Sequence, residues 1–124
     1  MCFAIINNPT VANFLEDFIG FNYKSTCENI DYNSLNGNIS QYEGCKVKFK
    51  GKINYTEPLN DGNLIVMNID GSEKKRICIF YDGQPILMSN NMITVYGVVY
   101  SKREVSQFGK YIPLIFARYI DFQS

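Results

Sequence analysis

The stretch "CKVKFKGKI", residues 45–53, decides how the chain folds, because its side chains alternate in character at every position. Lysines alternate with apolar residues and one glycine: Lys46, Lys48, Lys50 and Lys52 against Val47, Phe49, Gly51 and Ile53. A strand with one face in a core and the other in water has this period of two. The stretch therefore predicts a half-buried strand over residues 45–55 with a row of lysines on its outer face.

Further stretches with strand character follow, separated by turn residues such as Asp61 and Gly62: residues 64–70, 76–82, 92–101 and 111–122. Closing five such strands into a small barrel removes exposed edges and buries one face of each strand. Gly51 and Gly97, inside their strands, suit strong bends. We therefore expect a mainly β chain, a five-stranded Greek-key OB-fold barrel over residues 44–124.

The N-terminal part has a helical period instead. Apolar residues recur one helical turn apart over residues 9–19, and Gly20 is a natural stop for this helix. Ser25 or Thr26 could cap a second, short helical segment over residues 27–36. We expect residues 1–43 to form an N-terminal helical segment, an α-helical extension packed on the barrel.

Charge is distributed unevenly along the chain, although the formal net charge is zero. Residues 1–43 carry one basic and five acidic side chains, a net of −4, and residues 44–124 carry eleven and seven, a net of +4. This asymmetry is typical of a basic binding face, and equally of an acidic segment that docks on a basic domain.

Several chemistries are disfavoured. The chain has no histidine, the usual general base near neutral pH, and no phosphate loop or nucleophile elbow. Its four cysteines are far apart, so neither a zinc site nor a Cys27–Cys45 disulfide has support from spacing. Cys78 lies in an apolar run and is expected to be a buried thiol. We expect no enzymatic activity, no metal and no cofactor.

Two stretches resemble a known family. Residues 23–53 and 93–122 are similar to the OB-fold domain described as tRNA-anticodon-binding-like, which recurs in small Gram-positive bacterial proteins, often exported, lipid-anchored or fused to zinc ribbons. The most specific pieces are Y-x-G-x-x-V-x-F-x-G-x-I at 42–53, T-V-Y-G at 94–97 and I-P-x-I-x-A-x-Y-I at 112–120. The resemblance implies an OB fold and a binding module rather than an enzyme.

This chain departs from the family pattern in two ways: it has no evident leader or anchor, and it adds the helix at 9–19. No apolar run is long enough to span a membrane, and no basic residue precedes the first apolar run. We therefore expect a small cytoplasmic bacterial protein, for which a phage- or plasmid-borne origin is open. Export, after removal of an upstream leader, is the alternative localisation.

Single-stranded nucleic acid is the first candidate ligand, since cations would contact its backbone and exposed rings would stack on its bases. Tyr55 and Phe80 are additional rings that this role could use. The candidate binding residues are Lys46, Lys48, Lys50, Lys52, Lys74, Lys75, Arg76, Tyr81, Tyr96, Tyr100, Lys102, Arg103, Phe108 and Lys110.

Alternatives to this interpretation stay open. A row of lysines also protects a solvated strand from aggregation, and rings at alternate strand positions often pack in a core. A protein partner or an inhibited target protein, held by the same barrel face or by the N-terminal helix, is the second candidate. The zero net charge favours it.

Overall fold

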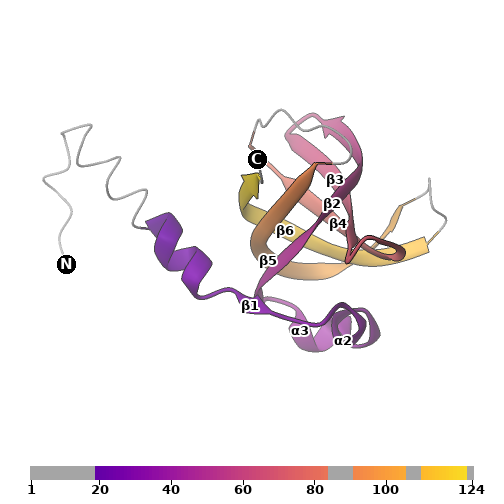
Figure 1. The fold of residues 1–124 in the computed structure, drawn as a ribbon, viewed down its shortest axis with the longest axis horizontal. Coiled ribbons are helices and arrows are strands. Elements are labelled where there is room, and N and C mark those ends of the chain that lie inside the picture. Colours follow the sequence, from indigo (N-terminus) through magenta and orange to yellow (C-terminus); the bar gives the residue numbers. More distant parts are fainter. Residues whose placement is uncertain (1–18, 84–90, 106–109, 123–124) are drawn as a thin grey trace, which may run out of the picture.

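The computed structural model describes residues 19–83, 91–105 and 110–122, and the protein is mainly β, as predicted (Figure 1). Residues 19–25 are helical. The elements that follow are β1 (Glu28–Asn29), α2 (Tyr32–Gly37), α3 (Ile39–Tyr42), β2 (Lys46–Leu59), β3 (Gly62–Ile69), β4 (Ser72–Tyr81), β5 (Met92–Val105) and β6 (Lys110–Phe122).

Five strands close into a barrel, which confirms that part of the prediction. The strand order is β2-β3-β4-β6-β5, and pairing between β2 and β5 closes the circle. β4 and β6 run parallel, whereas the other pairs within the barrel are antiparallel. β1 adds a short parallel strand beside the start of β2. Figure 1 shows these strands wrapped around a common axis.

Gly51 lies where β2 changes partners. It is opposite Ile93 of β5 on one side and opposite Ile69 of β3 on the other. A Cβ atom at this position would lie 2.4 Å from the carbonyl oxygen of Asn68. Only a residue without a side chain therefore allows β3 to approach so closely at the point where β2 is shared.

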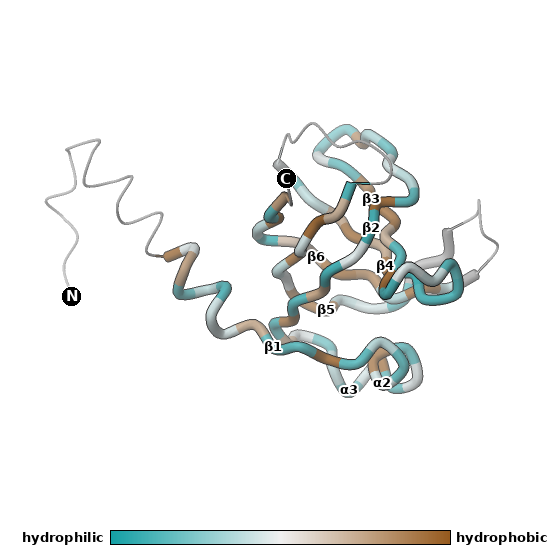
Figure 2. Tube along the Cα trace, in the orientation of Figure 1, coloured by the Kyte–Doolittle hydropathy of each residue, from teal (hydrophilic) through white to brown (hydrophobic). Residues whose placement is uncertain are grey.

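The alternation predicted for β2 is confirmed. Val47, Phe49 and Ile53 are buried inside the barrel, whereas Lys46, Lys50 and Lys52 are exposed and Lys48 is half-buried. The inner core continues through alternate residues of the other strands, among them Ile65, Ile79, Val95 and Ile115. In Figure 2, hydrophobic stretches of the chain lie along the strands.

A second apolar cluster lies on the outer side of the barrel. It is formed by residues of β3, β4 and β6: Leu64, Val66, Cys78, Ile112 and Leu114, all buried. Consecutive strand residues point to opposite faces, so β3, β4 and β6 are buried on both faces at these positions. Cys78 is buried, as predicted from its apolar surroundings in the sequence.

α2 closes one end of the barrel. Tyr32 and Leu35 on one face of this helix are buried in the same cluster as the inner residues of the strands. The helix begins at Asp31, whose carboxylate accepts a hydrogen bond from the backbone N–H of Ser34 at 3.2 Å. The segment before β2 is thus part of the core of the barrel.

The sequence-based description of the N-terminal helices needs three corrections. Gly20 does not end a helix, because residues 19–25 are helical and Gly20 is buried where a Cβ would meet the Tyr119 ring at 3.4 Å. Residues 28–29 form strand β1 rather than helix. Ser25 and Thr26 do not cap α2; their hydroxyls donate to backbone carbonyls three residues earlier. The rest of the predicted helix at 9–19 lies outside the described residues.

No helix in the described parts of the chain is both long and apolar enough to cross a membrane.

The close approach at Gly97 can be tested by substitution. A Cβ there would lie 2.2 Å from the carbonyl oxygen of Phe116, beside an irregularity in the β5–β6 ladder. Gly97→Ala should lower the free energy of unfolding by about 1–3 kcal/mol, measured by urea denaturation. Gly37→Ala is the matched control: a Cβ at Gly37 meets nothing within 4 Å, so stability should stay equal or rise. Equal stability of the two variants would contradict this description of the β5–β6 contact.

Candidate binding surface

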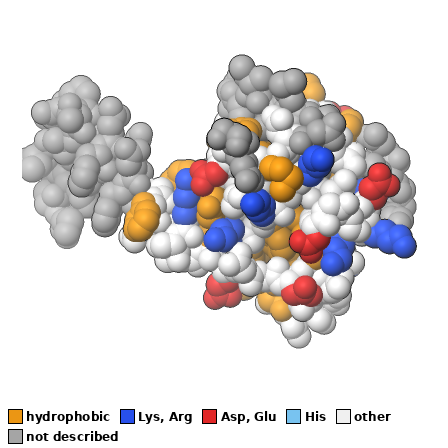
Figure 3. Space-filling model, in the orientation of Figure 1, with side chains coloured by type: hydrophobic (Ala, Val, Ile, Leu, Met, Phe, Trp, Pro, Cys, Tyr) orange, Lys and Arg blue, Asp and Glu red, His pale blue; other side chains and the backbone are white. Residues whose placement is uncertain are grey.

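The lysine row of β2 lies on the outer face of the barrel, as predicted. Lys46, Lys48, Lys50 and Lys52 pair across the ladder with Val98, Tyr96, Thr94 and Met92 of β5. On the face drawn in Figure 3, basic side chains are interspersed with hydrophobic and acidic ones. They do not form one continuous basic patch on that face.

The first half of the lysine row is engaged by the chain's own N-terminal segment, residues 19–27. The ammonium group of Lys46 donates to the hydroxyl of Thr26 at 3.4 Å and lies 4.9 Å from the centroid of the Tyr23 ring. β1 pairs with β2 at Val47 and Lys48. Docking of the acidic N-terminal segment was one of two interpretations of the charge asymmetry, and these described contacts to Lys46 come from a hydroxyl and a ring.

The same segment reaches the neighbouring strands through Lys24. Its ammonium nitrogen lies 2.7 Å from Oδ1 of Asp121 in β6. It also lies 5.3 Å from the ring centroid of Tyr96 and 5.6 Å from that of Tyr119. The Tyr23 ring meets Tyr119 edge-on, with 5.5 Å between centroids. Tyr96, a predicted stacking residue, is therefore half-buried beside this segment.

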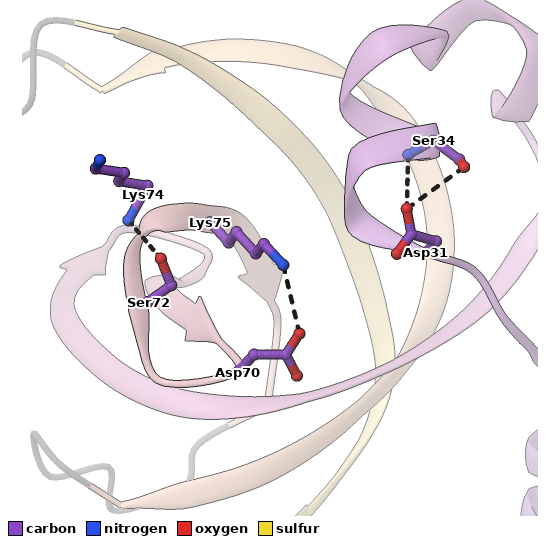
Figure 4. Close-up of polar contacts among 6 residues, drawn as sticks. All are labelled: Asp31, Ser34, Asp70, Ser72, Lys74 and Lys75. Carbon is purple, nitrogen blue, oxygen red and sulfur yellow. Dashed lines mark hydrogen bonds and ion pairs between the residues drawn. The ribbon is translucent and has the colours of Figure 1, made fainter.

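The second half of the row borders an open pocket of about 400 Å³. Lys50, Gly51 and Lys52 line it from β2, together with Asp70 and Gly71 and with Met92 of β5. Asp70 and Gly71 have φ angles of 54° and 69°, as in the two-residue hairpin turns of type I′. The Asp70 carboxylate turns toward the Lys75 ammonium at 3.7 Å (Figure 4).

Three rings form a continuous row across strands β5, β6 and β4, which we call the aromatic row: Tyr100, Phe116 and Phe80. Tyr100 stacks on Phe116 with centroids 4.6 Å apart and an interplanar angle of 15°. Phe80 meets Phe116 edge-on at 5.8 Å. Tyr100 is 56% exposed and Phe116 43%, so both rings are open to a ligand.

Phe116 was not among the predicted site residues. It lies in "IPLIFA", where apolar residues occupy successive positions because this part of β6 is buried on both faces. Alternation therefore carries no signal for the direction of its side chain. Only the structure gives this direction, because it places Phe116 opposite Phe80 in the parallel β4–β6 ladder.

The other predicted site residues are distributed around the barrel. Lys74 and Lys102 are exposed, and Lys75 and Arg76 are half-buried. Tyr81 packs against the inner core. Arg103 and Lys110 belong to β5 and β6, but their side chains are not described, and Phe108 lies outside the described residues.

Cys27, Cys45 and Cys78 are free thiols, so the structure has no Cys27–Cys45 disulfide. Burial raises the pKa of Cys27, although Lys46 and Lys48 act in the opposite direction. Within the described residues, no three His, Cys, Asp or Glu side chains are grouped as metal ligands.

A scan against family models finds no match, and a search of curated proteins finds no similar sequence.

The environment of Tyr96 predicts a pH dependence. Burial, the Asp121 charge and a hydrogen bond to Asp121 raise the pKa of Tyr96, against the lowering effect of Lys24. The unfolded chain, with a phenol pKa of about 10, then releases this proton first, so stability is lost as pH rises from there. We expect Tyr96→Phe to flatten the fall in the free energy of unfolding between about pH 9 and 11, measured by urea denaturation. An unchanged slope would contradict the environment described for Tyr96.

Proposed function

We propose that the barrel is an OB-fold of Greek-key topology that binds single-stranded nucleic acid on its outer face without catalysing a reaction. The strand order supports the fold assignment, because β2 pairs with both β3 and β5 while β4 runs parallel to β6. The helix α2 at one end of the barrel is compatible with it. The aromatic row is the observation that carries the binding proposal.

The aromatic row has the properties that base stacking requires. A base stacks on an aromatic ring whatever its identity, since every base has a π face. Tyr100 and Phe116 already stack on each other and remain about half exposed, so a base can extend the stack or cover it. Phe80 continues the row onto β4.

Cations lie along the same strands as these rings. Arg118 follows Phe116 on β6 and is exposed, with its guanidinium carbon 5.8 Å from the centroid of the Tyr119 ring. Lys102 on β5 is also exposed, but it pairs with Pro113 and therefore points to the opposite face from Phe116. The ladder also connects the aromatic row with the lysine row: Phe80 is opposite Phe116, Phe116 opposite Val98, and Val98 opposite Lys46. Neighbouring strands are about 4.8 Å apart, so the backbones of Lys46 and Phe116, two strands apart, are separated by about 10 Å across the sheet. A strand of nucleic acid that crosses the sheet would meet rings first and then the ammonium group of Lys46, which also contacts Thr26 and the Tyr23 ring.

A protein partner is the second candidate. Exposed aromatic rings are common in protein interfaces, and the zero net charge of the chain does not favour a polyanion. The dependence of affinity on salt concentration distinguishes the two candidates. Displacement of counterions from phosphates makes nucleic-acid binding steeply dependent on ionic strength.

Fluorescence anisotropy with a labelled single-stranded oligonucleotide tests the proposal. Tyr100→Ala and Phe116→Ala should each weaken binding by about five- to 150-fold, since each lost stack is worth about 1–3 kcal/mol. Affinity for the wild-type chain should fall steeply as salt is raised.

Tyr111→Ala is the matched control for these substitutions. Tyr111 is 64% exposed on the same strand, five residues before Phe116, and therefore points to the opposite face of the sheet. Its loss should leave the affinity unchanged. Absence of binding at low salt, or equal losses in all three variants, would contradict the proposal and favour a protein partner.

A further inference from the structure

The ammonium group of Lys24 lies in a site that the barrel builds from β5 and β6. Tyr96 and Tyr119 are directly opposite each other in the antiparallel ladder, and Asp121 follows two residues later on the same face of β6. Lys24 lies 2.7 Å from the carboxylate and 5.3 and 5.6 Å from the two ring centroids. The three groups that surround it therefore belong to the barrel and not to the segment that carries Lys24.

The chemistry of this site selects cations. The faces of tyrosine rings attract an ammonium group within about 6 Å, and a carboxylate accepts its charge-assisted hydrogen bond. Burial and the Asp121 charge raise the pKa of the Tyr96 phenol, as expected for neighbouring groups in one site. A phosphate would be repelled by the carboxylate, and a neutral amide would gain little from the rings. Alkylammonium groups are the ligands that interact favourably with both the tyrosine rings and the carboxylate.

Lys24 does not fill the site irreversibly. The side chains of Lys24 and Asp121 remain 31% and 48% exposed, and ion pairs at such positions are weak. The rest of the segment adds the edge-on Tyr23–Tyr119 contact, the approach of Gly20 to Tyr119, the Lys46 ammonium group over the Tyr23 ring and one long hydrogen bond from Lys46 to Thr26. On the same helical stretch, Ile19 and Phe21 are mostly exposed. A competing ammonium group can therefore reach the rings at small cost.

We propose that Tyr96, Tyr119 and Asp121 form a binding site for an alkylammonium group, which Lys24 occupies in this structure and which takes a lysine side chain of a protein partner in its place. The occupant that is present supports this choice of source, because it is a lysine carried by a polypeptide segment. The proposal does not depend on nucleic-acid binding, since this site attracts the opposite charge.

The test uses the full chain with Lys24→Ala, which empties the site, and follows backbone amide shifts near Tyr96 and Asp121 by NMR. The probes are n-butylammonium chloride and a peptide with the sequence of residues 19–26, "IGFNYKST". Sodium chloride of equal concentration serves as the reference for ionic strength. We expect saturable binding of both probes, tighter for the peptide, and weaker binding to the wild-type chain because Lys24 competes.

Controls separate recognition from a merely structural contact. Adding Tyr96→Ala should weaken binding by about two- to fivefold, as expected for the loss of one ring, while adding Tyr96→Phe should retain the contribution of the ring. Adding Asp121→Asn should weaken it further. Ser25→Ala, next to Lys24 but directed to the backbone of its own helix, should behave as wild type. If Lys24→Ala does not fold, Lys24→Gln replaces it.

Two results would overturn the proposal. A response that does not saturate, or that persists undiminished with Asp121→Asn, would make the Lys24 contact a structural ion pair only. Butylammonium binding as tight as that of the peptide, or equal binding of a peptide with alanine in place of its lysine, would overturn the assignment to a lysine of a protein partner.

Discussion

Closure of the barrel depends on β2 pairing with different strands along its two edges. Its first half lies between β1 and β5, and from Gly51 onward it pairs with β3. The change of pairing partner takes place within two residues, Gly51 and Lys52. It brings the backbone of β3 so close to Gly51 that no side chain fits there. Because the inner positions of β2 then belong to the core on both sides of this point, the four lysines must face outward along its whole first half.

The same geometry divides the lysine row between two environments. Lys46 and Lys48 lie beside the N-terminal segment and β1, while Lys50 and Lys52 lie beside the β3–β4 turn. The rings of β5 and β6 are divided in a similar way. Tyr96 and Tyr119 surround a cation together with Asp121, whereas Tyr100 and Phe116 stack on each other without a cation over either ring among the described contacts. The two proposals thus place neighbouring sites for ligands of opposite charge on one outer face.

Much of the fold could be predicted from the sequence, because apolar and polar side chains alternate along a β strand that has one face in the core and one in water. This pattern places the beginnings of β2 and β5, which continue beyond the predicted ends to Leu59 and Val105. The pattern disappears in β3, β4 and β6, where both faces are apolar, so the outward direction of Phe116 could not be inferred. The prediction of helix boundaries was wrong for a related reason. Gly20 belongs to the helical residues 19–25 and is buried beside Tyr119, almost one hundred residues later, and such a contact leaves no local signal.

The central claim is that the outer face of β4, β5 and β6 binds single-stranded nucleic acid through stacked rings. Side-chain NMR of the aromatic residues, with an unlabelled oligonucleotide added at low salt, tests it most directly. The account predicts that the rings of Tyr100, Phe116 and Phe80 shift together and with one dissociation constant, because they form one contiguous row. Shifts confined to Tyr96 and Tyr119, or no shift of any ring at saturating oligonucleotide, would contradict it.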